Sequence, residues 1–150
     1  MNELEVRRLV HEDVAAARTM FAMMARVFEE DDEPLGEDYL GYLLGREDFW
    51  ALAAFMGPDI VAGLTAHTLP MTRSHSSELF IYDLAVRQDH QRQGIASRLV
   101  LELQTTAAAA GIHEIFVAAD NEDRHALEFY RALGATASPV TIYTFERQGV

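Results

Sequence analysis

The chain has 150 residues, a length that suits one compact domain with its own hydrophobic core. It contains no cysteine, which excludes a disulfide framework, a thiolate metal site and a cysteine nucleophile. The formal net charge of −12 argues against nucleic acid as a partner, because phosphate binding needs a basic surface, and favours a small cationic partner. Negative charge that serves only solubility is the competing explanation.

No stretch approaches the roughly 20 apolar residues that span a bilayer. The acidic first residues, 1–5, lack the apolar core of a signal peptide. We therefore expect a cytoplasmic protein with no membrane association. The six histidines show no paired spacing on one predicted face, so we expect no metal.

Hydrophobic periodicity predicts interleaved strands and helices in one domain, 1–150. In the first half we expect a strand at 4–9, helices at 13–28 and 38–44, and a hairpin with strands at 49–56 and 60–69 around the turn signal 57–59. In the second half we expect a strand at 78–86, a helix from 93 or 94 to about 110, a strand at 112–119, a helix at 123–133 and a last strand at 140–145. Hairpins mixed with helices indicate an α/β (α+β) fold with a mixed sheet.

The segment from Gln91 to Ala96 follows a strand and a polar loop, and it opens the long helix. Helix N-termini carry unpaired N–H donors and partial positive charge, so an anion such as a pyrophosphate can bind there. Gly94 lets the backbone approach such a group. Arg87, Arg92 and Arg98 add local positive charge to an otherwise acidic chain. A glycine at a helix start is by itself more often a simple turn residue.

The pattern Gln/Arg-x-x-Gly-x-Gly/Ala in this context resembles the acetyl-CoA motif of the GNAT superfamily of N-acetyltransferases. The stretch from Ala126 to Ala135 resembles the family's Ala-x-x-Phe-Tyr-x-x-x-Gly-Phe segment. One departure is Asp123, where the family often has Asn. The resemblance implies the GNAT fold, a mostly antiparallel, twisted sheet of about six to seven strands with about four helices and a splay between the fourth and fifth strands.

The resemblance also implies acetyl-CoA as cosubstrate and direct attack of an amine in a ternary complex. The strand before the motif would pair with the pantetheine arm through its backbone amides, and Tyr130 matches the family's acid for the departing thiolate. Tyrosine on an amphipathic helix is otherwise usually a core residue. The implied cofactor contacts are Leu84, Ala85, Val86, Gln91, Arg92, Gln93, Gly94, Ile95, Ala96, Ser97, Ala126, Phe129 and Tyr130.

Asp83 is an unusual carboxylate inside an apolar strand. Strict alternation would put it on the face of Ile81 and Ala85, opposite Tyr82 and Leu84. It could hold an ammonium group and help remove its proton. Because an isolated Asp has a pKa of about 3.9, orientation of the substrate is the safer role. A salt bridge to a nearby arginine is the structural alternative.

The block 80–86, together with 92–96 and the segments 38–44 and 51–55, resembles the small aminoglycoside 3-N-acetyltransferases. That resemblance implies transfer to the 3-amino group of the deoxystreptamine ring and antibiotic resistance. Aminoglycosides are polycations, which suits the acidic balance of the chain. The acidic run 29–33 is either a lining of this site or a solvated loop. The implied substrate-binding residues are Glu78, Tyr82, Asp83, Asp120 and Asp123.

Three alternatives remain at this point. The amine could be a polyamine or another small amine. The domain could instead be a CoA-binding sensor without catalysis. A protein or peptide N-acetyltransferase would need an open groove, which no sequence feature indicates. The apolar segment 140–145 also suggests a homodimer.

Overall fold

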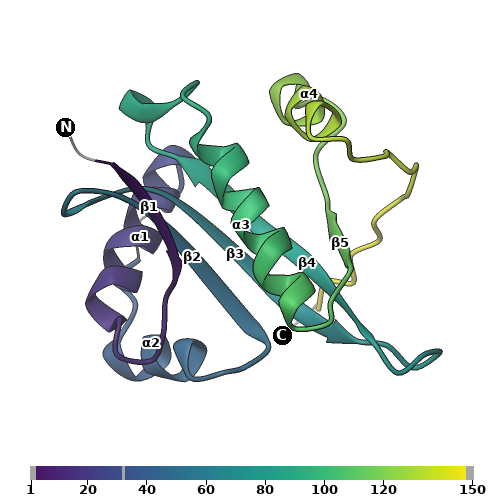
Figure 1. The fold of residues 1–150 in the computed structure, drawn as a ribbon, viewed down its shortest axis with the longest axis horizontal. Coiled ribbons are helices and arrows are strands. Elements are labelled where there is room, and N and C mark those ends of the chain that lie inside the picture. The colour runs from purple at the N-terminus through teal and green to yellow at the C-terminus, as the bar shows by residue number, and fades with distance from the viewer. Residues whose placement is uncertain (1–2, 32, 148–150) are drawn as a thin grey trace. The chain divides into compact units, whose positions relative to one another are not determined.

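The structure is a computed structural model that describes residues 3–31 and 33–147 (Figure 1). The chain separates into two compact parts, residues 1–118 and 119–150. The first part contains β1 (Leu4–Arg8), α1 (Val14–Val27), α2 (Glu37–Leu44), β2 (Phe49–Met56), β3 (Asp59–Pro70), β4 (Ser77–Val86), the 3₁₀ turn η1 (Gln88–His90), α3 (Ile95–Ala109) and β5 (Glu114–Val117). The second part contains α4 (Arg124–Ala132). The predicted helices are confirmed to within a residue or two.

The five strands form one sheet in the order β1-β2-β3-β4-β5. The first four are antiparallel neighbours, and β5 runs parallel to β4. The pairing of β4 with β5 joins only Glu78–Ile81 to Glu114–Val117, whereas β4 itself continues to Val86. The sheet therefore opens between its fourth and fifth strands past Ile81, as the family resemblance implied.

A β-bulge interrupts β4 at Tyr82. Thr65 pairs with Asp83 and the next residue, Ala66, pairs with Ile81, so Tyr82 is the extra residue on β4. Directly paired residues share a face and successive residues on β3 alternate, which puts Asp83 and Ile81 on opposite faces of the sheet. The prediction that Asp83 and Ile81 share a face is therefore wrong, because strict alternation fails at a bulge.

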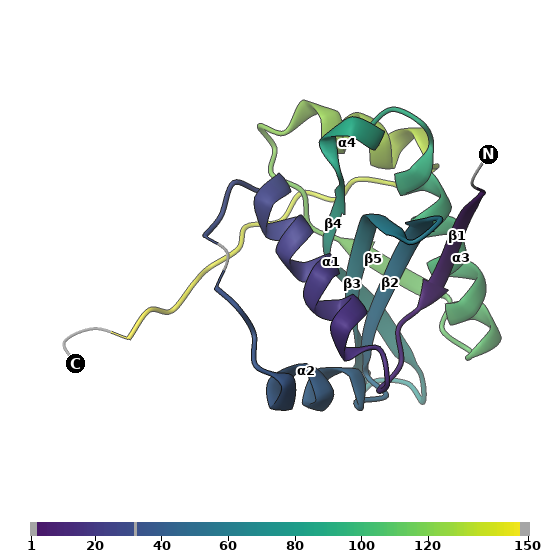
Figure 2. The same ribbon diagram turned by 90° about the vertical axis from the view of Figure 1, so that its left-hand side faces the viewer.

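Helices cover both faces of the sheet (Figure 2). On one face, buried residues of α1 and α2 pack with strand residues that include Phe49, Ala51 and Ala85. On the other face, α3 packs against β1 to β4. Its buried residues are Ile95, Leu99, Val100, Leu103 and Ala107, which recur at helical spacing. The α1 face is the one that carries Asp83, because Asp83 and Ala85 are two residues apart beyond the bulge.

Gly63 on β3 lets α1 approach the sheet closely. A Cβ atom there would lie 2.6 Å from Met20 Cγ and 2.8 Å from Met24 Sδ. We expect Gly63→Ala to lower the free energy of unfolding by about 1–3 kcal/mol, because the flexible methionines must shift to make room. The control is Gly41→Ala in helix α2. A Cβ at Gly41 would meet only His11 Nε2, at 3.7 Å, so this change should slightly raise the free energy of unfolding. Urea unfolding of both variants measures the difference, and equal midpoints would contradict the expectation.

The predicted strand at 140–145 is wrong for the single chain. The structure gives this segment no helix or strand, so the described sheet has five strands rather than six or seven. Its large apolar side chains are 72–98% exposed. A strand needs hydrogen-bonding neighbours, and no described strand pairs with this segment, so β-propensity alone does not form one.

Candidate active site

The turn between β4 and α3 contains two residues in the left-handed backbone region. Arg92 has a φ of 63° and Gly94 a φ of 80°. For arginine this conformation costs on the order of 1 kcal/mol or more. The side-chain amide of Gln91 donates to the carbonyl of Val86 at 2.9 Å, which ties the turn to the end of β4. The turn is therefore a specific structure and not a loose connection.

Gly94 is the N-cap residue of α3, and no side chain caps this helix. The first helical hydrogen bond runs from the Arg98 N–H to the Gly94 carbonyl at 3.1 Å, so the preceding N–H groups have no partner within the helix. A Cβ at Gly94 would meet nothing within 4 Å. Glycine is thus needed for its backbone conformation, and the space beside it is open to an anion.

Two side chains in and beside the turn have their own partners within the chain. Ile95 is only 3% exposed and belongs to the core, so only its N–H is available to a ligand. Arg87 is bound by Asp89 through Nε at 2.7 Å and Nη2 at 3.0 Å. These bonds, with a contact from His90, hold the pKa of Asp89 well below its usual range. The charge of Arg87 is therefore compensated locally, whereas Arg92 and Arg98 are exposed on the turn and the first turn of α3.

The end of β4 offers backbone groups to a ligand on one edge. Past Ile81, β4 pairs with β3 but not with β5. Ala85 is buried on the α1 face, and Leu84 pairs with Leu64 on the α3 face. An extended group entering here would therefore meet main-chain N–H and C=O groups rather than side chains. This arrangement fits the predicted role of Leu84, Ala85 and Val86 towards a pantetheine arm.

Asp83 stands next to this opening on the α1 face. Partial burial raises the pKa of its carboxyl, and the negative charge of Glu30 raises it further. No cation of the described chain forms an ion pair with Asp83, so the predicted salt-bridge alternative has no support. A bound ammonium group would offset the negative charges of Asp83 and Glu30 and so stabilise the ionised carboxylate of Asp83.

A strained turn positions Glu30 near Asp83. The Glu30 N–H donates to the Ala25 carbonyl at 2.9 Å, and the Glu29 N–H donates to the Arg26 carbonyl at 3.1 Å. This is the Schellman pattern of a helix end, in which Glu29 adopts a φ of 57° at the position that glycine usually takes. The start of the acidic run is therefore an ordered end of α1 with exposed carboxylates.

An aromatic row crosses the α1 face of the sheet. Register places Phe49, His67, Phe80 and Phe116 side by side on β2, β3, β4 and β5. The Phe80 and Phe116 rings stack at 4.9 Å, and Tyr82 meets the His67 and Phe80 rings edge-on. Sequence reasoning missed this row and treated His67 as an ordinary residue, because only strand register brings these rings together.

Glu78 and Tyr82 lie on the same strand as Asp83, β4, where Tyr82 is adjacent to Asp83 and Glu78 is about 15 Å away along the strand. Tyr82 is 63% exposed. Glu78 pairs directly with Glu114 across β4 and β5, and like charges at such positions repel. The part of the α1 face formed by β4 and β5 therefore carries both acidic and aromatic side chains.

The remaining predicted site residues belong to the second part of the chain. Asp123 caps α4, because its Oδ1 accepts from the Ala126 N–H at 3.1 Å. Asp120 is exposed and accepts from the Glu122 N–H at 2.9 Å. The predicted strand at 112–119 is shorter in the structure, Glu114–Val117, so Asp120 lies three residues past its end. Partial burial and the charge of Asp123 raise the pKa of Tyr130, whose ring lies 5.0 Å from that of Phe129.

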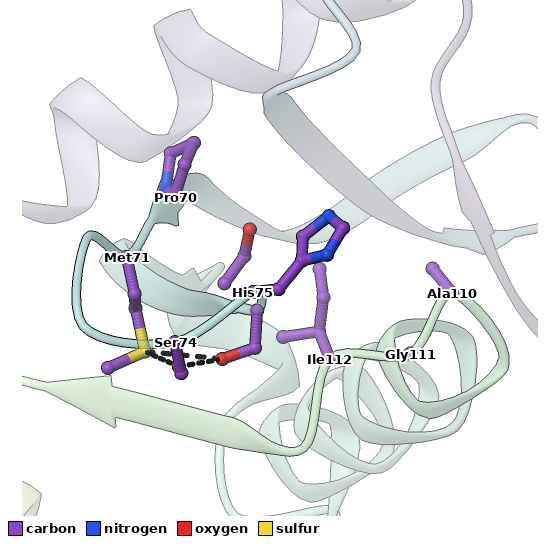
Figure 3. Close-up of a pocket in the computed structure, with 9 residues that line it drawn as sticks. Pro70, Met71, Ser74, His75, Ala110, Gly111 and Ile112 are labelled. Atoms are coloured by element: carbon purple, nitrogen blue, oxygen red, sulfur yellow. Dashed lines mark hydrogen bonds between the residues drawn. The ribbon is translucent and has the colours of Figure 1, made fainter.

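A second hollow lies at the opposite end of α3 (Figure 3). It has a volume of about 480 Å³, and its walls include Met71, His75 and Gly111. Ser74 and Ser76 contact the sulfur of Met71 at 3.8 and 3.5 Å. Since α3 has 15 residues, this hollow is about 22 Å from Gly94. It is therefore separate from the turn at Gln91 to Ala96.

The model of the acetyltransferase (GNAT) family matches residues 14–135 of the chain, which include the Gly94 turn and the Phe129–Tyr130 segment. The chain belongs to the GNAT family. No match was found among curated proteins. Among the described residues, no group of three or more His, Cys, Asp or Glu could hold a metal ion, and no helix is long and apolar enough to cross a membrane.

Solved structures of aminoglycoside acetyltransferases have a similar fold over nearly the whole chain. An aminoglycoside acetyltransferase, meta-AAC0020 from an uncultured soil metagenomic sample, matches in its complex with trehalose at 31% identity and a TM-score of 0.90, over 97% of each chain. Its complex with sisomicin matches at 30% identity with the same TM-score and coverage. A second soil aminoglycoside acetyltransferase, HMB0005, matches at 34% identity and a TM-score of 0.89, over 97% of this chain and 99% of the other.

Proposed function

We propose that this GNAT protein transfers an acetyl group from acetyl-CoA to a primary amine of an aminoglycoside, at the 3-amino group of the deoxystreptamine ring. The observation that carries this proposal is the half-buried carboxylate of Asp83, which forms no ion pair with any described residue and lies beside the open edge of β4. Resistance to the antibiotic would be the consequence in a cell, and a cytoplasmic location stays a prediction.

Acetyl-CoA suits the open edge and the turn together. The uncapped N–H groups of α3 and the exposed Arg92 and Arg98 can bind its pyrophosphate. The backbone of β4 past Ile81 can pair with its extended arm. That order along β4 and α3 would bring the thioester towards Asp83, since the arm runs back along the strand from the turn.

Chemistry at this site needs a neutral amine next to a proton acceptor. Asp83 would bind the incoming ammonium group and take its proton directly or through water. The amine nitrogen then bonds to the thioester carbon, and the bond from that carbon to sulfur breaks. The nitrogen loses its second proton as the new bond forms. Tyr130 is the proposed donor of the proton that the sulfur takes, and it regains a proton as the nitrogen gives up its second one, which leaves an amide, CoA with its free thiol and the first proton on Asp83. The raised pKa of Asp83 makes it a better base than an exposed aspartate.

The surroundings of Asp83 favour a polycationic sugar over a simple amine. Glu30 adds a second negative charge near Asp83, and Glu78 lies further along β4 on the same face of the sheet. Tyr82 presents a 63% exposed ring on this strand, against which an aminocyclitol ring can stack. A linear polyamine would use the carboxylates but has no ring to stack. The relative of 30% identity was solved with sisomicin, which supports the same choice.

We expect thiol release from acetyl-CoA with gentamicin and sisomicin, and much slower release with spermidine or a peptide. The reason is that only the aminoglycosides match both the carboxylates and the exposed ring. Thiol titration measures turnover, and mass and NMR analysis of the product locates the acetyl group. Release with spermidine alone would make the protein a polyamine acetyltransferase. Binding of acetyl-CoA without release from any amine would instead indicate a sensor.

A further inference from the structure

We propose that His67 is a positioning residue of this site: it holds the ring of Tyr82 beside Asp83, and in this way makes the site prefer an amine carried on a ring to a linear amine. His67 would act within the proposed acetyl transfer to an aminoglycoside, on which this inference rests. It lies on β3, next to the strand that carries Tyr82 and Asp83.

The bulge on β4 brings a ring and a carboxylate together. Successive residues of a regular strand point to opposite faces of the sheet, and a bulge breaks that rule. Asp83 lies on the α1 face. The extra residue, Tyr82, turns its ring to the same face, because that ring meets those of His67 and Phe80. A cyclitol ring that bears an ammonium group can therefore contact the tyrosine ring and the carboxylate at once, whereas a linear amine can use only the carboxylate.

The ring of Tyr82 is held by two neighbouring ring edges. Its centroid lies 5.8 Å from that of His67, with the planes at 80°, and 5.9 Å from that of Phe80, with the planes at 76°. Both are the edge-to-face arrangement that aromatic pairs favour. The bulge leaves Tyr82 without a partner residue on β3, so the strand ladder fixes its backbone less firmly than that of a paired residue. These two ring contacts therefore set the orientation of the Tyr82 ring.

His67 links the ring of Tyr82 to the hydrophobic core. Its imidazole lies 5.4 Å from the ring of Phe49 on β2, which is only 7% exposed and packs in the core with α1 and α2. Phe80, the other neighbour of Tyr82, lies on β4 itself, so His67 is the contact that ties the ring to the neighbouring strands. Among the described residues, none forms a hydrogen bond or an ion pair with the imidazole of His67. Its hold on Tyr82 therefore depends on ring packing, which phenylalanine can reproduce.

Steady-state kinetics and calorimetry with sisomicin test the role of His67. We expect His67→Ala to raise the KM and the Kd for sisomicin about three- to tenfold, as loss of one aromatic edge contact would, with kcat within about twofold of the wild type. The KM for acetyl-CoA and the slow turnover of spermidine should not change, because neither uses the Tyr82 ring. His67→Phe should restore the wild-type KM. The matched control is His113→Ala, which removes an exposed histidine outside the aromatic row and should leave all these values unchanged.

A double-mutant cycle shows whether His67 acts through Tyr82. Tyr82→Ala should raise the KM for sisomicin by itself. Adding His67→Ala to it should raise the KM no further, because the ring that His67 holds is already gone. Full addition of the two effects would mean that His67 contacts the substrate independently, which overturns the proposal. A folded His67→Phe that keeps the KM of His67→Ala overturns it as well.

Thermal unfolding of each variant separates this role from a loss of folding. His67→Leu, which keeps the bulk of the side chain but has no ring edge, replaces His67→Ala if the alanine variant lacks an unfolding transition, and the same rise in KM is expected. A wild type that turns over no aminoglycoside would refute the proposed function and this inference with it. An active wild type whose KM for sisomicin equals that of His67→Ala refutes the inference alone.

Discussion

Asp83→Asn is expected to lower kcat/KM for an aminoglycoside by about 100-fold or more, while acetyl-CoA binding stays unchanged. The substitution keeps the shape of the side chain but removes the charge that would bind ammonium and accept its proton. Asp83 lies on β4 ahead of the turn that would bind pyrophosphate, so the donor side should be unaffected. The largest loss should therefore be in turnover with the amine.

Asp83→Asn should not lower the free energy of unfolding, because the pKa of Asp83 is raised in the folded chain. Burial and Glu30 raise the pKa of Asp83 in the folded chain above its unfolded value. Ionised Asp83 therefore lowers stability at neutral pH, and this loss disappears as the pH falls through the raised pKa. Asp83→Asn should accordingly be as stable as the wild type at neutral pH, or slightly more stable.

Steady-state thiol release and acetyl-CoA calorimetry measure these effects. The control is Asp48→Asn, which removes an exposed carboxylate bound to Arg46 and should leave kcat/KM unchanged.

The activity of the wild type should fall at acid pH as Asp83 takes a proton. Glu30→Gln should move that fall to lower pH, because one cause of the raised pKa is removed. Wild-type kcat/KM in Asp83→Asn would contradict the assigned role.

Gly94→Ala is expected to weaken acetyl-CoA binding by about tenfold or more. Gly94 has a φ of 80°, and a side chain in that conformation costs about 1–2 kcal/mol. Relaxing that strain would turn the first N–H groups of α3 away from a bound phosphate, and about 1.4 kcal/mol corresponds to tenfold in affinity. The loss should appear in the Kd and KM for acetyl-CoA before it appears in the KM for the amine.

The chain offers a matched control at the other end of the same helix. Gly111 has a φ of 83°, and a Cβ there would also meet nothing within 4 Å. Gly111→Ala should therefore lose similar stability in thermal unfolding but keep its affinity for acetyl-CoA. If both variants bind acetyl-CoA equally well, the turn at Gly94 does not hold the pyrophosphate. Calorimetry on the two proteins side by side decides between these results.

Local patterns in the sequence were enough for the elements and for the position of the turn. Apolar residues at helical spacing predicted α1 and α3, and Gly94 and Gly111 mark the two ends of α3 because a left-handed backbone favours glycine. The α/β class and the GNAT family were also predicted correctly, and the family resemblance implied the splay after the fourth strand. These features depend on neighbours in the chain or on a motif a few residues long.

Pairing between distant segments decided the rest. The bulge at Tyr82 depends on the register of β4 against β3, and it reversed the expected relation of Asp83 to Ile81. The aromatic row from Phe49 to Phe116 exists only because four strands align. The partnership of Asp83 with Glu30 required α1 to pack over the sheet. Residues 140–145 have the composition of a strand, yet a strand forms only where a second edge supplies its hydrogen bonds.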